Sequence, residues 1–343
     1  MGNGQPIIVV EDLTKVYPGG ITAVNGISFH VRQGEIFGFL GPNGAGKSTT
    51  IMMLTTLIKP TSGRATVHGY DIVREANAVR LSLGYVSQDL AVDDALTARE
   101  NLYLQGRFYH LPKPEIEKRI DEVLKLVNLH DRADNRVETY SGGMRKRLDI
   151  AEGLIHRPRI LFLDEPTLGL DIQTRREIWR YIENLRAEYG MTIFLTTHYM
   201  DEADSLCDRI AIIDRGVIKA IDSPSTLKSQ IGGDIVTLKI DSVTPERVQA
   251  AVRATEALPF VRSVKKQENS NDSYVVVVND GETAIPAIFH AIGREGASIS
   301  SIALKKPTLD DVYLFFTGKE LRQESGSRED AMRARMIMRR VRR

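Results

Sequence analysis

A glycine-rich segment at residues 41–48 has the residue types and the spacing of a phosphate-binding loop. It reads GPNGAGKS and fits G-x-x-x-x-G-K-[ST], between the apolar run EIFGFL (35–40) and a helical pattern that begins at Lys47. In such a loop the backbone N–H groups turn toward phosphate oxygens, and the helix N-terminus adds positive potential. Lys47 would reach the β- and γ-phosphates, and the Ser48 hydroxyl would ligate Mg²⁺. The alternative is a glycine-rich turn with a chance Lys-Ser pair, but the flanking strand and helix favour phosphate binding.

Two adjacent carboxylates follow another apolar run. RILFLDEP (159–166) has the pattern of a strand that ends at Asp164 and Glu165. The first carboxylate suits Mg²⁺, usually through water, and the second could polarise a water for attack on the γ-phosphate. Alone, such a pair is more typical of a helix cap or a solvated turn. Placed after a phosphate-binding loop, it predicts a hydrolytic site.

A third segment, YSGGM (140–144) followed by RKRLDIAEGL, resembles the signature motif of ABC-type ATPases. The other motifs of that family stand around it in order: the phosphate loop, Gln88 in YVSQD, LDEP (163–166), GLD (169–171) as the D-loop, and Thr197-His198. Many ATPases have a phosphate loop, whereas this signature between Gln88 and the carboxylate pair is typical of this one family.

The resemblance implies that the chain binds ATP with Mg²⁺ and hydrolyses it. For ATP it assigns one ring that would stack on adenine and the loop around the phosphates: Tyr17, Gly41, Pro42, Asn43, Gly44, Ala45, Gly46, Lys47, Ser48 and Thr49. The catalytic residues would be Glu165, His198 and Gln88, and the Mg²⁺ ligands Ser48, Gln88 and Asp164. For Tyr17 the alternative is simple packing after a strand.

The same resemblance implies a site shared between two subunits. Ser141, Gly142 and Gly143 would contact the γ-phosphate held by the opposite subunit, with Asp171 in the D-loop beside it. We therefore expect a second ATPase subunit, most simply an identical copy. Gln88 would also sense an integral-membrane permease.

Two segments indicate the branch of the family. HYMDEADSLCDRIAIIDRGVIKAIDSP (198–224) and PTLDDVYLFFTG (307–318) look like ATP-binding subunits of daunorubicin-resistance-type exporters. This implies a peripheral subunit on the cytoplasmic face of the membrane that moves drugs, lipids or glycans outward through a separate permease. An importer ATPase and a non-transport ABC ATPase are the alternatives. A translation factor of the family would carry two cassettes, whereas this sequence has one phosphate loop and one signature. A repair ATPase would carry a coiled coil or zinc modules between its motifs, whereas the segment between Ser48 and Ser141 is short and holds no cysteine.

The elements that must position these motifs follow an α/β pattern. Apolar runs at 35–40, 159–164, 191–197 and 209–214 lack strict alternation, as expected of strands buried on both faces. Helical patterns lie between them, at 47–58, 115–129, 141–156 and 174–189. Thr97 with Glu100 predicts a capping box, and Arg215-Gly216 predicts a hairpin turn.

Beyond Pro224 the pattern changes to strand-helix-strand-strand-helix-strand, the ferredoxin-like order. We expect an ABC ATPase domain at 5–228, whose family fold is a RecA-like core with antiparallel β and helical subdomains. A small α+β domain at 230–318 and a flexible basic tail at 319–343 follow. The second domain shows no catalytic motif, so we expect a regulatory or dimer-stabilising role, with 312–316 packing against the partner.

Composition excludes several classes. The 343 residues carry a net charge of +1, so no global field indicates a nucleic-acid partner, and none is expected. A single cysteine, Cys207, excludes internal disulfides and Cys-rich zinc sites. No apolar run approaches the roughly 18 residues that cross a bilayer. The segment 331–343 holds six Arg among Met and Ile side chains, which predicts either a solvated terminus or a contact with anionic lipid.

Overall fold

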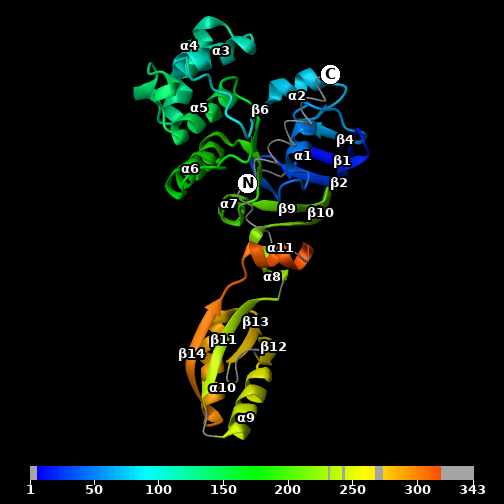
Figure 1. The fold of residues 1–343 in the computed structure, drawn as a ribbon, viewed down its shortest axis with the longest axis vertical. Coiled ribbons are helices and arrows are strands. Elements are labelled where there is room, and N and C mark those ends of the chain that lie inside the picture. The colour runs from blue at the N-terminus through cyan, green and yellow to red at the C-terminus, as the bar shows by residue number, and fades with distance from the viewer. Residues whose placement is uncertain (1–5, 231, 242–243, 267–272, 318–343) are drawn as a thin grey trace.

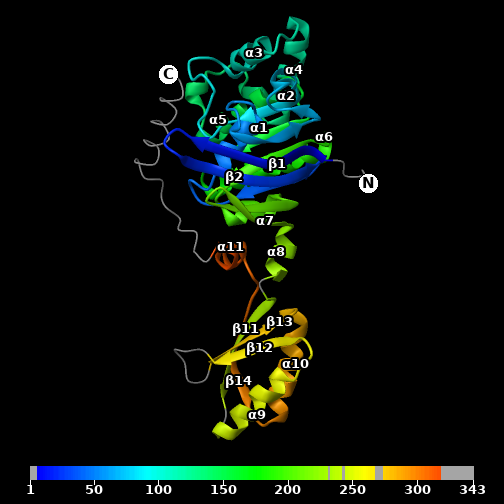
Figure 2. The same cartoon turned by 90° about the vertical axis from the view of Figure 1, so that its right-hand side faces the viewer.

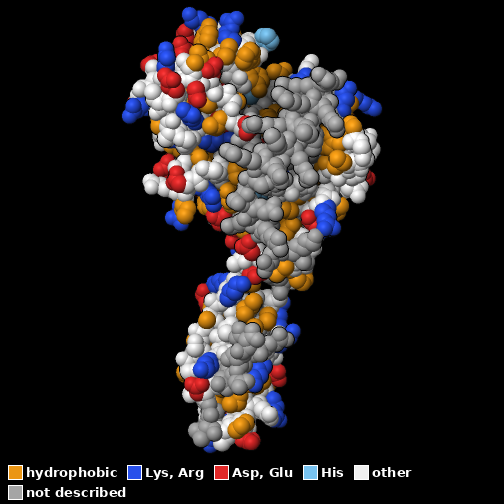
Figure 3. Space-filling view, viewed as in Figure 1, with side chains coloured by type: hydrophobic (Ala, Val, Ile, Leu, Met, Phe, Trp, Pro, Cys, Tyr) orange, Lys and Arg blue, Asp and Glu red, His pale blue; other side chains and the backbone are white. Residues whose placement is uncertain are grey.

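The structure, a computed structural model, describes residues 6–230, 232–241, 244–266 and 273–317. These residues form a large upper body and a smaller lower body joined by a narrow neck (Figures 1 and 2). Figure 3 shows the same neck in space-filling form, with acidic and basic side chains interspersed on this face. Among the helices of the described ranges, none has the combined length and apolarity needed to cross a membrane.

A six-stranded sheet forms the centre of the upper body, in the order β10-β9-β3-β8-β7-β6. Its strands are β3 (Ile36–Leu40), β6 (Leu83–Val86), β7 (Ile160–Asp164), β8 (Thr192–Thr197), β9 (Arg209–Asp214) and β10 (Val217–Asp222). All are parallel except β10, which pairs antiparallel with β9. Every residue of β3, β7 and β8 is buried, as expected of strands covered on both faces. The strands predicted from the apolar runs are confirmed.

The predicted hairpin is confirmed as well. Arg215 and Gly216, between β9 and β10, have φ of 50° and 75°. Positive φ at both central residues is what a tight two-residue hairpin turn requires.

A second, antiparallel sheet covers one face of the central sheet. It consists of β1 (Pro6–Tyr17), β2 (Ile21–Arg32), β4 (Ser62–Val67) and β5 (Tyr70–Asp71), in the order β2-β1-β4-β5. Aromatic rings fill the space between the sheets: Phe29 of β2 lies 5.6 Å from Phe37, 5.1 Å from Phe39 and 6.1 Å from Phe194, centroid to centroid. Such ring contacts add to the burial energy and fix the spacing of the two layers.

Helix α1 (Lys47–Leu54) packs between these sheets and is shorter than the predicted 47–58. The Thr55 hydroxyl donates to the Ile51 carbonyl over 2.8 Å, and Thr56 has a left-handed φ of 64°. A β-branched residue in that conformation ends the helix. The apolar side chains that suggested a longer helix continue as a turn.

Further helices of the upper body lie around the central sheet, and some of them form an arm at one end (Figure 1). They are α2 (Ala76–Ser82), α3 (Ala98–Phe108), α4 (Lys113–Leu126), α5 (Gly142–Leu154), α6 (Ile172–Tyr189) and α7 (Met200–Leu206), with short 3₁₀ turns η1 (His130–Arg132) and η2 (Val137–Thr139). In the arm α3, α4 and α5 contact one another. The predicted capping box is confirmed: Thr97 caps α3 and Glu100 returns a bond to the Thr97 backbone.

The lower body is a four-stranded antiparallel sheet with two helices on one face. Its elements are β11 (Asp234–Asp241), α9 (Pro245–Glu256), β12 (Val261–Lys266), β13 (Ser273–Val278), α10 (Gly281–Arg294) and β14 (Ser298–Lys305), and the sheet order is β12-β13-β11-β14. Alternate residues of β11, Val236, Leu238 and Ile240, are buried in one apolar cluster with Ile288 and Ile292 of α10. The predicted ferredoxin-like order is confirmed.

The chain crosses the neck twice. It leaves the upper body after α8 (Pro224–Gln230) and returns after β14 as α11 (Leu309–Thr317). Helix α11 contacts α7, α8 and β10, and Leu309, Val312 and Tyr313 are buried in the same cluster as Leu227 of α8. The expectation that 312–316 packs against a partner is therefore wrong for Val312 and Tyr313, which pack on their own upper body.

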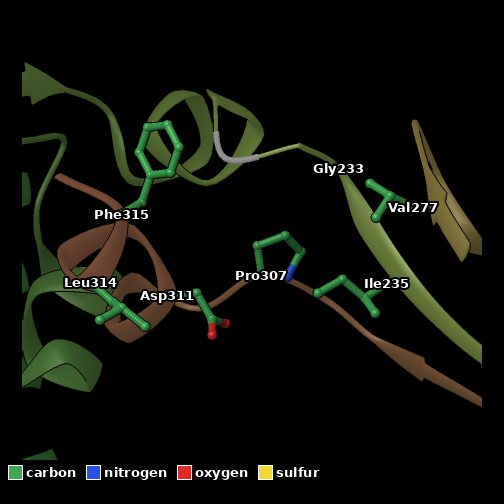
Figure 4. Close-up of a pocket in the computed structure, with 7 residues that line it drawn as sticks. All are labelled: Gly233, Ile235, Val277, Pro307, Asp311, Leu314 and Phe315. Atoms are coloured by element: carbon green, nitrogen blue, oxygen red, sulfur yellow. The ribbon is translucent and has the colours of Figure 1, made fainter. Parts of the chain in front are cut away.

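At the neck a cavity of about 280 Å³ separates the two bodies (Figure 4). It is lined by Gly233, Ile235 and Val277 below and by Pro307, Asp311, Leu314 and Phe315 above. Gly233 has φ of 90°, and a Cβ there would lie 2.1 Å from the Val278 carbonyl oxygen. Only glycine fits where the chain enters the lower body.

The packing of α11 predicts a contrast between two leucines of this helix. Leu309→Ala removes a side chain that is 1% exposed, and we expect a loss of about 2–5 kcal/mol in the free energy of unfolding. Leu314→Ala, at a position 41% exposed, is the matched control and should cost under about 1 kcal/mol. Urea denaturation of both variants measures the difference. Equal losses would show that α11 is not held by the upper body.

Candidate active site

The phosphate loop lies between the end of β3 and the start of α1. A Cβ on Gly41 would lie 2.3 Å from the Ile213 carbonyl oxygen, and one on Gly46 would lie 2.5 Å from that of Ala23. Gly46, with φ of 109°, precedes α1, and because glycine has no side chain it cannot cap the first N–H groups of this helix. The first N–H groups of α1 therefore remain as donors at the loop, which is the arrangement that binds phosphate. Asn43 and Gly44 are exposed at the tip, and Thr49 is half-buried in α1.

The Lys47 ammonium group is folded back into its own loop. Its Nζ donates to the carbonyl oxygens of Gly41 (2.7 Å) and Pro42 (3.1 Å), and lies 3.1 Å from Glu165 Oε1. Lys47 and Glu165 are 4% and 7% exposed, so this ion pair is buried. The structure thus joins the two motifs that the sequence placed about 120 residues apart.

Glu165 is held from three sides. It follows β7 with a left-handed φ of 48°, and its N–H donates to the carbonyl oxygen (3.2 Å) and the hydroxyl (3.1 Å) of Thr196. His198 Nδ1 lies 3.1 Å from Glu165 Oε2. Burial alone would raise the pKa of Glu165, but the His198 hydrogen bond and the Lys47 charge outweigh it and hold the pKa below its ordinary value. The carboxylate is kept ionised and oriented.

Asp164 and Ser48 form the second half of the site. Ser48 Oγ donates to Asp164 Oδ1 over 3.1 Å, and Thr196 Oγ1 donates to the same oxygen over 2.5 Å. Burial raises the pKa of Asp164, and both hydroxyl bonds oppose that shift. A hydroxyl and a carboxylate side by side are the oxygen donors that Mg²⁺ takes from a protein that also binds phosphate. These residues fit the ion.

Two predicted residues lie apart from this cluster. Gln88 is exposed in the loop after β6. Tyr17 is half-buried at the end of β1, and the Lys15 ammonium lies 5.3 Å from its ring centroid. Their predicted roles stay predictions.

The signature residues stand at another surface. Ser141 caps α5 by accepting from the Met144 N–H (3.3 Å), and it is exposed together with Gly142. A Cβ on Gly143 would lie 2.5 Å from Thr174 Cγ2, so α5 and the start of α6 meet here without room for a side chain. Helices α5 and α1 are well separated in Figure 1. One chain therefore presents its signature away from its own phosphate loop.

The D-loop residue Asp171 adjoins the signature and caps α6. It accepts from the N–H (2.9 Å) and the hydroxyl (2.6 Å) of Thr174, the residue that Gly143 approaches. These bonds lower the pKa of Asp171, so the exposed side chain stays charged. Both motifs thus form one exposed edge.

Sequence reasoning missed Thr196. This buried residue bonds to both Asp164 and Glu165, because β8 pairs with β7 and places Thr196 opposite Asp164. Its signal was present: it is the first threonine in the TT pair that closes the apolar run 191–197.

Comparisons with known proteins agree with this geometry. Residues 24–168 match the ABC transporter family, and residues 223–315 match the C-terminal domain of DrrA1-3-like ATP-binding proteins. The daunorubicin resistance ATP-binding protein DrrA3 of Streptomyces coeruleorubidus is 41% identical, over 92% of this chain and 97% of its own. The linearmycin resistance ATP-binding protein LnrL of Bacillus subtilis is 39% identical, over 92% and 100%. The Nod factor export ATP-binding protein I of Ralstonia nicotianae is 37% identical, over 92% and 95%.

Solved structures resemble the upper body. The cbiO1 subunit of the cbiONQ ABC transporter complex from Clostridium perfringens is 32% identical, with a TM-score of 0.61 over 65% of this chain and 90% of its own. The ATP-binding cassette MJ0796, solved as a dimer with ADP and Pi, is 29% identical, with a TM-score of 0.57 over 63% and 98%.

The lowered pKa of Glu165 predicts a pH dependence of stability. A carboxyl group whose pKa is lower in the folded chain than in the unfolded chain stabilises the fold at pH values above its unfolded pKa, which is near 4.5. This stabilisation is lost as the pH falls. In the nucleotide-free protein, Glu165→Gln should therefore unfold more easily than wild type at neutral pH. The difference in the free energy of unfolding between the two proteins should narrow as the pH falls from about 6 toward 3. Urea denaturation across that pH range measures the difference. A difference that widens in acid would contradict a lowered pKa of Glu165.

Proposed function

The chain belongs to the ABC transporter family and is an ATP-binding, ATP-hydrolysing subunit, and from this premise we propose that it powers an exporter through a separate membrane permease. The observation that carries the catalytic part is the meeting of Lys47, Glu165 and His198 beside the phosphate loop. Those three groups are what hydrolysis of a γ-phosphate requires: a cation for the phosphate, a carboxylate for the water and an orienting ring.

Each side chain has a defined task in this proposal. Lys47 exchanges its carbonyl partners and Glu165 for phosphate oxygens, which frees one carboxylate oxygen of Glu165. That carboxylate then orients the attacking water and accepts its proton. His198 holds the other oxygen of Glu165, at 3.1 Å, and so keeps it aimed.

Mg²⁺ completes the site in this proposal. Ser48 and Asp164 would hold the ion, with Gln88 reaching it from its exposed loop. When bound, Mg²⁺ neutralises charge on the β- and γ-phosphate oxygens. Tyr17 would stack on adenine after the Lys15 ammonium moves from its ring.

We further propose that two copies of the chain complete two sites. The exposed signature edge of one copy, with Ser141, Gly143 and Asp171, would close over the phosphate loop of the other. The separation of α5 from α1 within one chain supports this, as does the dimeric state of MJ0796. A two-fold axis then makes both sites equivalent.

Mixing two inactive variants tests the shared site. Lys47→Ala removes the phosphate-binding charge, and Ser141→Ala removes the hydroxyl that acts on the opposite subunit, so each variant alone should be inactive. A mixed dimer has one site with both changes and one with neither. An equal mixture should therefore regain about a quarter of wild-type phosphate release, since half of its dimers hold one intact site of two. A mixture as inactive as its parents would contradict the composite site.

The direction of transport rests on the relatives. Their names include resistance to daunorubicin, doxorubicin and linearmycin and the export of Nod factor. We propose outward movement of drugs, lipids or glycans here, with the subunit on the cytoplasmic face. Import, and a function outside transport, are the competing outcomes of the next experiment.

Inverted membrane vesicles that contain the subunit and its permease test export. With ATP outside, at least one of a fluorescent anthracycline, a labelled lipid and a labelled oligosaccharide should accumulate inside. Glu165→Gln should reduce that accumulation at least about tenfold, because it removes the base. Loss of preloaded compound from the vesicles would indicate import. Hydrolysis without movement of any probe would indicate a function outside transport.

Two further parts of the chain enter as proposals. We propose that the lower body is regulatory or stabilises the dimer, because its described residues contain neither a candidate metal cluster nor a phosphate loop. The basic segment 331–343 lies outside the described residues. Its six Arg support the proposal of a contact with anionic lipid beside the permease.

A further inference from the structure

A carboxylate outside the nucleotide site is completely buried. Glu202 lies on α7, four residues after His198, and is 0% exposed. Taking a carboxyl group out of water costs several kcal/mol unless hydrogen bonds replace its hydration. The partners of Glu202 should therefore reveal why it is there.

Both hydrogen bonds of Glu202 Oε1 come from elements of the active site. Thr167, two residues after Glu165, donates its hydroxyl over 2.7 Å. Trp179 of α6, the helix that Asp171 caps, donates Nε1 over 3.0 Å. One oxygen thus joins the loop that follows Glu165, the helix that Asp171 caps and the helix that follows His198.

Two features keep this junction rigid. Thr167 is itself 0% exposed, so the loop between β7 and α6 is anchored inside the protein just after Glu165. On another side α7 is covered by α11: Met200, Ala203 and Leu206 share a buried cluster with Val312 and Tyr313.

Burial raises the pKa of Glu202, while hydrogen bonds from Thr197, Thr167 and Trp179 oppose the shift. A group that accepts hydrogen bonds suffices at this position, because all three donors are neutral.

We propose that Glu202 is a positioning residue for ATP hydrolysis. By bonding Thr167 and Trp179 at once, it fixes the loop after Glu165 to α6 and α7. Glu165 and His198 then keep their 3.1 Å contact when Lys47 is drawn to phosphate. This inference rests on the proposed hydrolytic role of Glu165, and Glu202 itself does not touch the nucleotide.

Three variants separate positioning from structure. Glu202→Leu keeps much of the volume but removes the acceptor, so kcat for ATP hydrolysis should fall about tenfold to a hundredfold. The KM for ATP should stay within about twofold, because the phosphate loop is untouched. Glu202→Gln keeps an oxygen for both donors and should restore kcat to within about twofold of wild type. Thr167→Val, a substitution of matched shape, should reproduce a large part of the loss.

Two measurements make the result decisive. Glu165→Gln, run in parallel, tests the proposed function: if it hydrolyses ATP at the wild-type rate, that proposal fails whatever the Glu202 variants do. Trp179 is the only tryptophan of the chain, so its fluorescence reports the Glu202 junction directly. Its emission should change in Glu202→Leu and stay near wild type in Glu202→Gln.

The inference is overturned by any of three results obtained while Glu165→Gln is inactive. One is an unchanged kcat in Glu202→Leu. Another is a Glu202→Gln protein as slow as Glu202→Leu. The third is a parallel fall of nucleotide binding, kcat and thermal stability in both Glu202→Leu and Thr167→Val, which indicates a merely structural role. If Glu202→Leu does not fold, Thr167→Val and Glu202→Gln carry the test.

Discussion

A buried ion pair, Lys47 with Glu165, is the interaction on which this active site depends. Removing each charge from water costs several kcal/mol, so neither side chain can be left without partners. In the structure they satisfy each other, and carbonyl oxygens and His198 complete the set of partners. In the mechanism that we propose, a phosphate that enters the loop competes for Lys47, and the same exchange frees the carboxylate for water. The proposal thus links phosphate binding and activation of water through one contact.

The parallel sheet is what brings these groups together. The motifs lie far apart along the chain, at the ends of β3, β7 and β8, but these three strands are neighbours and end at one edge. Since β8 pairs directly with β7, Thr196 reaches both carboxylates, and His198 follows at the end of β8. The antiparallel sheet and its aromatic layer hold β3 from one side. The exactness of the site therefore comes from strand order and not from any single loop.

Much of this could be predicted from the sequence, because the informative patterns are local. The phosphate loop, the carboxylate pair and the capping box each depend on residues within a few positions of one another. The end of α1 was missed because the apolar run continues past Thr56, whose backbone conformation stops the helix. Thr196 and Glu202 were missed for another reason: their partners lie more than 20 residues away. The destination of α11 was not predictable either, since an amphipathic helix does not specify which apolar surface covers it.

The double crossing of the neck makes the lower body an insertion between α8 and α11 and not an appendage. A module tethered at both ends cannot swivel freely, because turning it twists two chain segments about each other. The chain enters the lower body beside Gly233 and leaves it beside Pro307. A tilt of its sheet would therefore act on α8 and α11 together, and these two helices contact each other. One of those helices, α11, also rests on α7, which begins just after His198. The lower body is thus connected, through α11 and α7, to the segment that carries His198.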